Sequence, residues 1–183
     1  LRVGAYHLAT CLRSPLWHNS AWSEPPRTAL DEANEFAQVA DMVLKPGFLP
    51  PALDVEEHAV SYIETSPGVW VVDPSVGMLD PLARMGAEPL AAWIIDWCTE
   101  VERLSGVKPI VYMSKSYAAD LAPYLRDRYG LWIAATSDTA GEPSVPAWGS
   151  WDVHQHDWFG AVNGVAANVD LDVLEAPIEE RLL

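Results

Sequence analysis

Two acidic residues, Asp54 and Glu56, stand one residue apart at the end of an apolar stretch, in the sequence PPALDVE. In an extended strand, residues i and i+2 point to the same side, about 6.6 Å apart, so both carboxylates would project together while Val55 packs behind them. Neighbouring carboxylates raise each other's proton affinity, which can leave one protonated as a general acid while the other stays ionised. This division of roles is typical of glycosidases.

An isolated pair of this kind is more often two solvated acids that follow a strand, so the surrounding elements decide its meaning. Short apolar strands alternate with amphipathic helices along the first three quarters of the chain. Strands are predicted at residues 2–9, 50–56, 108–114 and 130–136. This alternation predicts parallel βαβ units and an α/β fold, in which reactive groups gather at the carboxyl ends of the strands.

Three helices are predicted between these strands. The first has a capping box at Thr28 and Asp31 and ends at Pro46-Gly47. Its proposed buried stripe comprises Leu30, Ala33, Ala37, Ala40 and Leu44. The second starts at Glu88-Pro89, stops at Gly106, and has a stripe of Leu90, Ile94, Trp97, Val101 and Leu104. A short third helix is predicted from Tyr117 to Leu125.

Two other regions lack helical periodicity. Residues 59–87 are rich in Pro and Gly and are predicted to be an inserted loop within a single domain of residues 1–183. The last third, which contains SWDVHQHDW and ANVDLDVL, is predicted to form strands joined by loops. We therefore expect the final strands of the fold to have no helices between them.

Composition excludes several classes of function. The formal net charge of −15 repels phosphate backbones, so nucleic acid is not an expected partner. No apolar run has the length of a membrane span, and the N-terminal residues do not have the pattern of a signal peptide. Cys11 and Cys98 fit neither a zinc signature nor a disulfide framework, so we expect buried thiols, with one bridge left open. The nine tryptophans suit core packing or stacking against sugar rings.

Five motifs in a conserved order resemble the glycoside hydrolase family 25 lysozymes, the N-acetylmuramidases of bacterial and phage origin. They are LRVGAYHLA, PPALDVE, GVKPIVYMS, YGLWIAA, and WDVHQH with NVDLDVL. The resemblance implies an irregular TIM-like β/α barrel whose last strands are helix-free. It also implies cleavage of the β-1,4 bond between N-acetylmuramic acid and N-acetylglucosamine, with peptidoglycan glycan strands as the partner. Such an enzyme would be extracellular or cell-wall-directed, either secreted or delivered by a phage.

The resemblance also assigns roles to residues. Glu56 matches the family's proton donor, and Asp54 matches the partner carboxylate that stabilises an oxocarbenium-like centre or an intermediate formed by the substrate's N-acetyl group. Asp170 matches a further acid of the pocket, and we prefer it to Asp172 because it falls in the family's Val-Asp pattern. The residues expected to contact the substrate are Tyr6, Tyr112, Trp132 and Gln155.

The sequence departs from the family in two places. The family's first Gly-Ile-Asp strand is not found, so we expect a barrel incomplete at its N-terminus, with the open edge covered by residues 59–87, by another chain or by an upstream segment. The family's Trp-Gln-Tyr is replaced by His154-Gln155-His156. Strand alternation points both histidines away from the face of Gln155, so we expect neither a metal nor another cofactor, although Asp54, Glu56 and His58 could add ligands.

Two alternatives to the lysozyme interpretation remain. The missing first acid would fit a non-catalytic or weakly active carbohydrate-binding module on a degenerate barrel, although such a module has no need of paired acids. A chitinase-like hydrolase shares the paired acids. It normally has further Asp residues upstream, where this chain has Pro51, Ala52 and Leu53.

Overall fold

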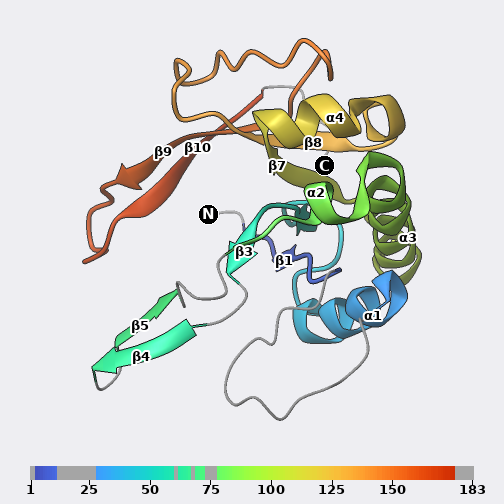
Figure 1. The fold of residues 1–183 in the computed structure, drawn as a ribbon, viewed down its shortest axis with the longest axis horizontal. Helices are drawn as coiled ribbons and strands as arrows, with labels where there is room; N and C mark the ends of the chain where they lie inside the picture. Colours follow the sequence, from blue (N-terminus) through green and yellow to red (C-terminus); the bar gives the residue numbers. More distant parts are fainter. Residues whose placement is uncertain (1–2, 12–27, 60–61, 67–68, 73–77, 176–183) are drawn as a thin grey trace.

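The computed structural model describes residues 3–11, 28–59, 62–66, 69–72 and 78–175. Its central element is a six-stranded sheet (Figure 1). In spatial order the strands are β1 (Tyr6–Leu8), β2 (Ala52–Asp54), β7 (Ile110–Ser114), β8 (Gly130–Ala134), β9 (Val153–Gly160) and β10 (Val169–Leu174). The strands from β1 to β9 run parallel to their neighbours, and β10 returns antiparallel to β9.

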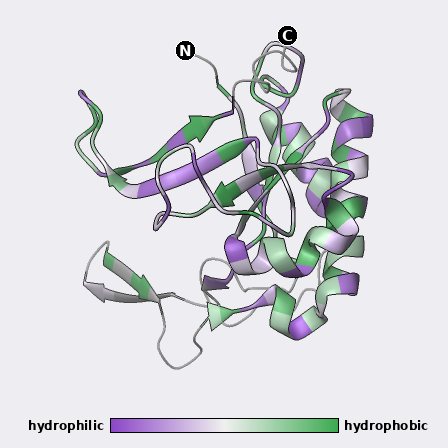
Figure 2. Ribbon diagram, turned by 90° about the horizontal axis from the view of Figure 1, so that it is seen from above, coloured by the Kyte–Doolittle hydropathy of each residue, from purple (hydrophilic) through white to green (hydrophobic). Residues whose placement is uncertain are grey.

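Helices connect the parallel strands and cover one face of the curled sheet (Figures 1 and 2). These are α1 (Ala29–Ala40), α3 (Ala87–Ser105) and α4 (Lys115–Leu125). After β8 the chain forms β9 and β10 with no helix between them in the described part, as predicted. The predicted α/β fold is confirmed: the described strands form a half-barrel similar to those of lysozymes, and a closed TIM-like barrel stays a prediction.

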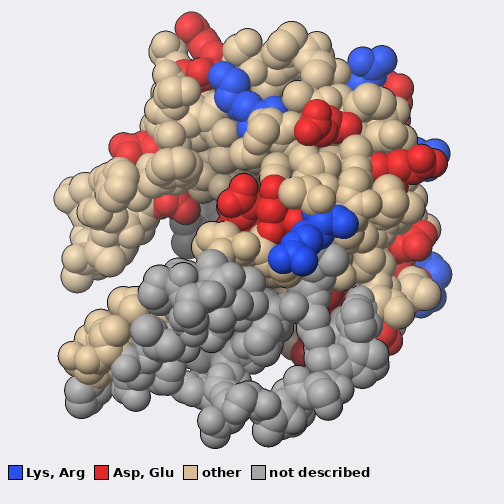
Figure 3. Space-filling view, in the orientation of Figure 1, with Lys and Arg blue, Asp and Glu red and all other residues tan. Residues whose placement is uncertain are grey.

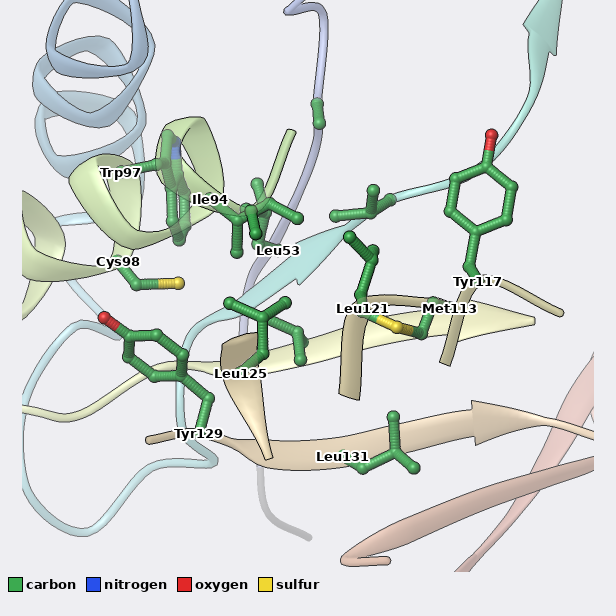
Figure 4. Packing of buried hydrophobic residues seen from close by; sticks show 14 of the residues in the cluster. Leu53, Ile94, Trp97, Cys98, Met113, Tyr117, Leu121, Leu125, Tyr129 and Leu131 are labelled. Carbon is green, nitrogen blue, oxygen red and sulfur yellow. The ribbon is translucent and has the colours of Figure 1, made fainter. Parts of the chain in front are cut away.

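The core lies between the sheet and these helices, because alternate strand residues point toward the helices. Leu53 of β2 and Val55, which follows the strand, are fully buried there, as is Trp97 of α3. Figure 4 shows strand and helix side chains of this cluster packed together. Burying each large apolar side chain contributes about 1.5–3 kcal/mol. The intervening strand residues therefore face the other side of the sheet, where Asp54 lies.

The first helix has the predicted capping box and most of the predicted buried stripe. Thr28 Oγ1 accepts a hydrogen bond from Asp31 N at 3.1 Å, and Thr28 N donates to Asp31 Oδ2 at 3.1 Å. Ala33, Ala40 and Leu44 are buried as predicted, whereas Leu30 is 51% exposed. Glu32 and Phe36 widen the buried face, because Phe36 packs against Trp97 of α3, with ring centroids 5.2 Å apart.

The second predicted helix is confirmed as α3. It ends where Gly106 adopts a left-handed conformation with φ of 71°, which glycine adopts without steric cost. Leu104, placed on the buried stripe from its spacing, is exposed in the last turn. The short third helix is confirmed as α4, which starts at Lys115, two residues before the predicted start.

The prediction of an irregular loop at residues 59–87 is wrong for much of that segment. The segment contains the antiparallel pairs β3 (His58–Ala59) with β6 (Met78–Leu79) and β4 (Tyr62–Ser66) with β5 (Val69–Val72), followed by the helix α2 (Pro81–Met85). Residues 60–61, 67–68 and 73–77 lie outside the described residues. The short strands have few residues in which periodicity could show, and α2 depends on Asp80, whose side chain accepts from Ala83 N at 3.0 Å.

Both cysteines are buried thiols that are not joined to each other, so the disulfide left open by the sequence is absent. Burial raises the pKa of the Cys98 thiol above its usual range. Among the described helices, none combines the length and apolar character needed to span a bilayer.

Candidate active site

One row of the sheet brings a carboxylate and two aromatic rings to the face opposite the helices. Asp54 is the last residue of β2 and pairs with Tyr112 of β7, which in turn pairs with Trp132 of β8. Paired residues of adjacent strands point to the same face, so these side chains lie side by side. Tyr112 and Trp132 meet edge to face, with ring centroids 5.2 Å apart and planes at 78°.

The carboxyl group of Asp54 is placed where ionisation is unfavourable. Its Oδ1 atom is buried and has no hydrogen-bond partner among the described residues. Burial is the main cause that raises the pKa of Asp54 to about 8, and the negative charge of Glu56 adds to it. A carboxyl group in this state holds its proton near neutral pH unless a positive charge comes close.

Glu56 lies two residues after the end of β2, beyond Val55, and is less deeply buried than Asp54. Burial raises its pKa, and the charges of Asp170 and Glu57 raise it further. The effect of Asp170 shows that β10 brings an acid from the far end of the sequence close to Glu56. Acidic side chains gather near the centre of this face of the molecule (Figure 3).

The hydroxyl group of Tyr112 is influenced by four acids, which are Asp54, Glu56, Asp170 and Asp172. It donates a hydrogen bond to Gln155 Oε1 at 2.8 Å. Its pKa is raised first by burial and then by the charges of Glu56, Asp54, Asp170 and Asp172. Tyr112 therefore stays a neutral donor, and the four carboxylates form one electrostatic group around it.

Asp172 belongs to this group as well as Asp170. Trp132 Nε1 donates to Asp172 Oδ1 at 2.7 Å, and Asp172 pairs with Gln155 across the β9–β10 ribbon. Burial raises the pKa of Asp172, the bond from Trp132 lowers it and the charge of Asp170 raises it. The alternation of the two acids in the sequence VDLDV was the signal for a shared face, and the choice of Asp170 as the acid of the family's Val-Asp pattern stays a prediction.

Tyr6 is the site residue most distant from this group. It pairs with Ala52 of β2, two residues before Asp54. Residues two apart in a strand point to the same side, so Tyr6 faces the same side of the sheet as Asp54. It lies on the edge strand of the described sheet and is 66% exposed. No contact between Tyr6 and the acids is found in the described structure, so its role as a substrate contact stays a prediction.

The two histidines beside Gln155 are minor influences on the acids: their charges lower the pKa of Asp172, against the larger effect of burial, which raises it. His154 is fully buried, with Nδ1 accepting from Gly141 N at 3.1 Å and Nε2 3.0 Å from the carbonyl oxygen of Ala135. The ring of His156 lies 6.0 Å from that of His154. Within the described ranges, no three His, Cys, Asp or Glu residues form a group that could hold a metal ion.

Trp158 was missed by sequence reasoning, and His58 was considered only as a possible metal ligand. Trp158 Nε1 donates to Gln155 Oε1 at 2.9 Å, the same oxygen that Tyr112 contacts. His58 is buried, and neither ring nitrogen has a hydrogen-bond partner in the part of the chain that is described. Strand alternation does not predict the contact of Trp158, because residues 155 and 158 would then point to opposite faces.

A shallow hollow lies at the other end of the parallel strands. Its lining includes Lys108, which precedes β7, and Arg128 and Gly130 at the start of β8. Asp54 lies at the carboxyl end of β2, so this hollow is separate from the acidic group. In parallel α/β sheets, ligands bind at the carboxyl ends of the strands, which favours the acidic group as the reactive site.

Several solved structures have a similar fold. The bacterial lysozyme from Streptomyces coelicolor superposes with a TM-score of 0.63 at 18% identity, over 98% of this chain and 70% of that chain. A family 25 glycosyl hydrolase from Bacillus anthracis gives a TM-score of 0.60 at 20% identity, over 100% of this chain and 68% of that chain. The spore cortex lytic enzyme SleM from Clostridium perfringens gives 0.56 at 22%, over 83% and 46%.

Sequence comparison adds a curated relative and a family. The protein YegX of Escherichia coli strain K12 is 27% identical over 134 residues, which are 73% of this chain and 48% of YegX. The chain thus spans about half the length of the curated relatives it matches. The family model described as "Glycosyl hydrolases family 25" matches residues 1–165, which include Asp54, Glu56 and all of β9. The chain therefore belongs to glycosyl hydrolase family 25.

Proposed function

We propose that this chain is a peptidoglycan hydrolase that cleaves the β-1,4 bond between N-acetylmuramic acid and N-acetylglucosamine. The observation that carries the proposal is the buried, unpartnered carboxyl group of Asp54 beside Glu56, with the pKa of both groups raised. Glycoside hydrolysis needs one carboxyl group that donates a proton and a second that meets positive charge. Membership of family 25 and the lysozyme structures of similar fold support the same substrate.

Glu56 is the proton donor in this proposal. The pair holds one proton near neutral pH, and in the substrate-free site that proton rests on Asp54. Positive charge that develops on the sugar stabilises ionised Asp54 and so favours the state in which Glu56 carries the proton. Glu56 then protonates the glycosidic oxygen as the bond to the anomeric carbon breaks, and water completes the hydrolysis. Asp170 keeps the pKa of Glu56 high, so that the acid remains protonated until it reacts.

A peptidoglycan substrate implies that the protein acts at the cell wall, outside the cytoplasmic membrane, after secretion or delivery by a phage. The chain's negative charge and the acidic site argue against nucleic acid as a partner. The residues proposed to hold the glycan beside the acids are Tyr6, Tyr112, Trp132 and Gln155. No step of the proposed reaction requires a metal or cofactor.

The test compares Glu56→Gln with Glu57→Gln, a matched change at the adjacent exposed acid. Loss of a general acid should reduce the rate about 10²- to 10⁴-fold, so Glu56→Gln should abolish measurable clearing of purified cell walls, whereas Glu57→Gln should retain it. Borohydride reduction and mass analysis of the products identify the bond. Reduced N-acetylmuramic acid at the new ends supports the proposal, and reduced N-acetylglucosamine contradicts it.

Variants of the other acids test the assigned roles. Asp54→Asn should be nearly as damaging as Glu56→Gln, because a neutral amide cannot meet the positive charge on the sugar. Asp172→Asn should cost little, since the amide oxygen can still accept the bond from Trp132. Wall binding without cleavage in the parent chain would favour the carbohydrate-binding alternative, and cleavage of chitin oligosaccharides alone would favour the chitinase-like one.

A further inference from the structure

Two large aromatic side chains are exposed on the β9–β10 ribbon. Trp158 is 51% exposed and Phe159 is 74% exposed, and both belong to β9. The ribbon projects away from the helices, so these rings have no share in the main core (Figure 1). Leaving apolar surface in water costs about 25 cal/mol per Å², and adjacent exposed aromatic residues often mark a binding surface.

Irregular pairing directs Trp158 toward the acidic site. Gln155 pairs with Asp172 and Asp157 pairs with Leu171, so β9 has one more residue than β10 over this step. This is the geometry of a β-bulge, which re-aims the side chains that follow it. Because of the extra residue, the indole of Trp158 reaches the face of Gln155 and donates to its Oε1 atom. A second irregularity follows before Gly160 pairs with Val169.

Trp158 is continuous with the acidic group. Gln155 Oε1 accepts from both Tyr112 and Trp158, so a single oxygen links the ring beside Asp54 to the ring on the ribbon. Within the second irregularity, between the Asp157–Leu171 and Gly160–Val169 pairs, Asp170 lies opposite Trp158 and Phe159 across the ribbon, and its charge acts on Glu56. Trp158 therefore extends the face of the site, and Phe159 adds an exposed ring at the next residue of the strand.

We propose that Trp158 and Phe159 form a sugar-stacking subsite that binds a pyranose ring of the glycan strand beyond the two sugars joined by the cleaved bond. This inference rests on the proposed function, because it takes the glycan strand as the ligand. Aromatic faces bind the apolar face of a sugar ring through area and dispersion, without charge. Residues 153–174 contain no Lys or Arg and contain three Asp residues, so an anionic ligand is disfavoured on this ribbon.

The test measures binding rather than cleavage, in the Glu56→Gln background. Calorimetry with soluble glycan fragments of two, four, six and eight sugars should show affinity that rises with length. Trp158→Ala and Phe159→Ala should each weaken binding of the longer fragments roughly tenfold, which is the loss expected for one aromatic contact, and should leave the disaccharide unchanged. Phe159→Leu should lose most of the same affinity, because leucine has no flat face.

Val162→Ala is the matched control, since Val162 is an exposed apolar residue on the same ribbon connection. It should leave all affinities unchanged, and circular dichroism should show that every variant is folded. Equal loss at every fragment length, or no loss in either alanine variant, overturns the subsite. A parent dimer that dissociates on Phe159→Ala, without a change in glycan affinity, assigns the rings to a contact between copies and also overturns it.

The failure of this inference can be told apart from failure of the proposed function. Length-dependent loss of binding with no cleavage by the parent chain would sustain the subsite and contradict the hydrolase. Cleavage that depends on Glu56, with glycan binding that is insensitive to Trp158 and Phe159, would do the reverse.

Discussion

At the scale of single residues, Glu56 differs from Asp54 in what perturbs it. Asp54 is perturbed mainly by burial and has an unpartnered oxygen, whereas Glu56 also feels Asp170 and Glu57. A sequence of the form Asp-Val-Glu presents the two acids as equivalent. In the proposed function these different surroundings separate the roles: the deeper group would meet charge inside the site, and the shallower one would reach a leaving oxygen.

Asp170→Asn should shift the high-pH limb of kcat/KM to lower pH. That limb reports loss of the proton from the general acid, and removing the charge of Asp170 lowers the pKa of Glu56. Glu57→Gln, whose charge has a smaller effect, should shift the limb less in the same direction. Titration of labelled glutamate carboxyl groups by NMR measures the same pKa if the variant is too slow to assay. An unmoved Glu56 pKa in Asp170→Asn would contradict the arrangement.

Asp54 should make the protein less stable as pH rises from about 4 to about 8. Its pKa is about 8 in the folded chain against an ordinary value of 3.8, so in this window the folded state holds a proton that the unfolded state has released. One such proton lowers the free energy of unfolding by up to about 1.4 kcal/mol per pH unit. Asp54→Asn should flatten the pH dependence between pH 4 and 8, measured by urea unfolding. Identical slopes for parent and variant would refute the buried, protonated state.

At the scale of elements, features that depend on sequence neighbours were predicted better than features that depend on contacts between elements. The capping box at Thr28 and the glycine stop at Gly106 depend on neighbours in sequence, and both are confirmed. The burial of Phe36 in α1 depends on its contact with Trp97 of α3 and was not predicted. The bulge that directs Trp158 depends on pairing between β9 and β10, which no local pattern encodes. Strand alternation is a local pattern, and it predicted that Asp54 and Glu56 project together. It did not predict that Asp54 is the more deeply buried of the two.

Glu32 illustrates a long-range interaction that joins two elements. It is fully buried in α1, accepts from Thr10 N at 3.0 Å and lies 2.7 Å from His7 Nε2, so it connects the helix to β1. His7 in turn stacks on Trp97, with centroids 5.6 Å apart. The spacing of apolar residues did not predict the burial of Glu32, because a glutamate is rarely buried without partners supplied by another element.

Glu32→Ala should destabilise the fold, because it leaves Thr10 N and His7 buried without their partner. Each such group costs about 1–3 kcal/mol, so the midpoint of urea unfolding should fall clearly. Gln38→Ala, at an exposed position of the same helix, should change the free energy of unfolding by less than about 0.5 kcal/mol. Glu32→Gln should lie between them, since the amide oxygen can still accept from Thr10. Equal midpoints for parent and Glu32→Ala would show that α1 is held to β1 by apolar packing alone.

At the scale of the whole molecule, the net negative charge and the position of the acidic face both bear on how the proposed substrate would approach. The half-barrel exposes its acidic face between two antiparallel ribbons, β9–β10 and β4–β5 (Figures 1 and 3). The formal net charge is −15, while cell walls carry carboxylates of their own. Long-range repulsion should therefore oppose the approach to the wall, and binding must come from short-range contacts such as those of the aromatic rings.

Wall hydrolysis should accordingly be faster at moderate than at very low ionic strength. The Debye length falls from about 30 Å at ~0.01 M salt to about 8 Å at ~0.15 M. This screens the repulsion between the chain and the wall but not the short-range contacts at the site. The expected change is a lower apparent KM for suspended walls with little change in kcat. Glu102→Gln combined with Asp120→Asn, two exposed changes on α3 and α4 away from the acids, should raise the low-salt rate toward the high-salt value. A rate that falls steadily as salt is added would show instead that attraction governs the encounter, and would direct attention to the cations around Lys108 and Arg128.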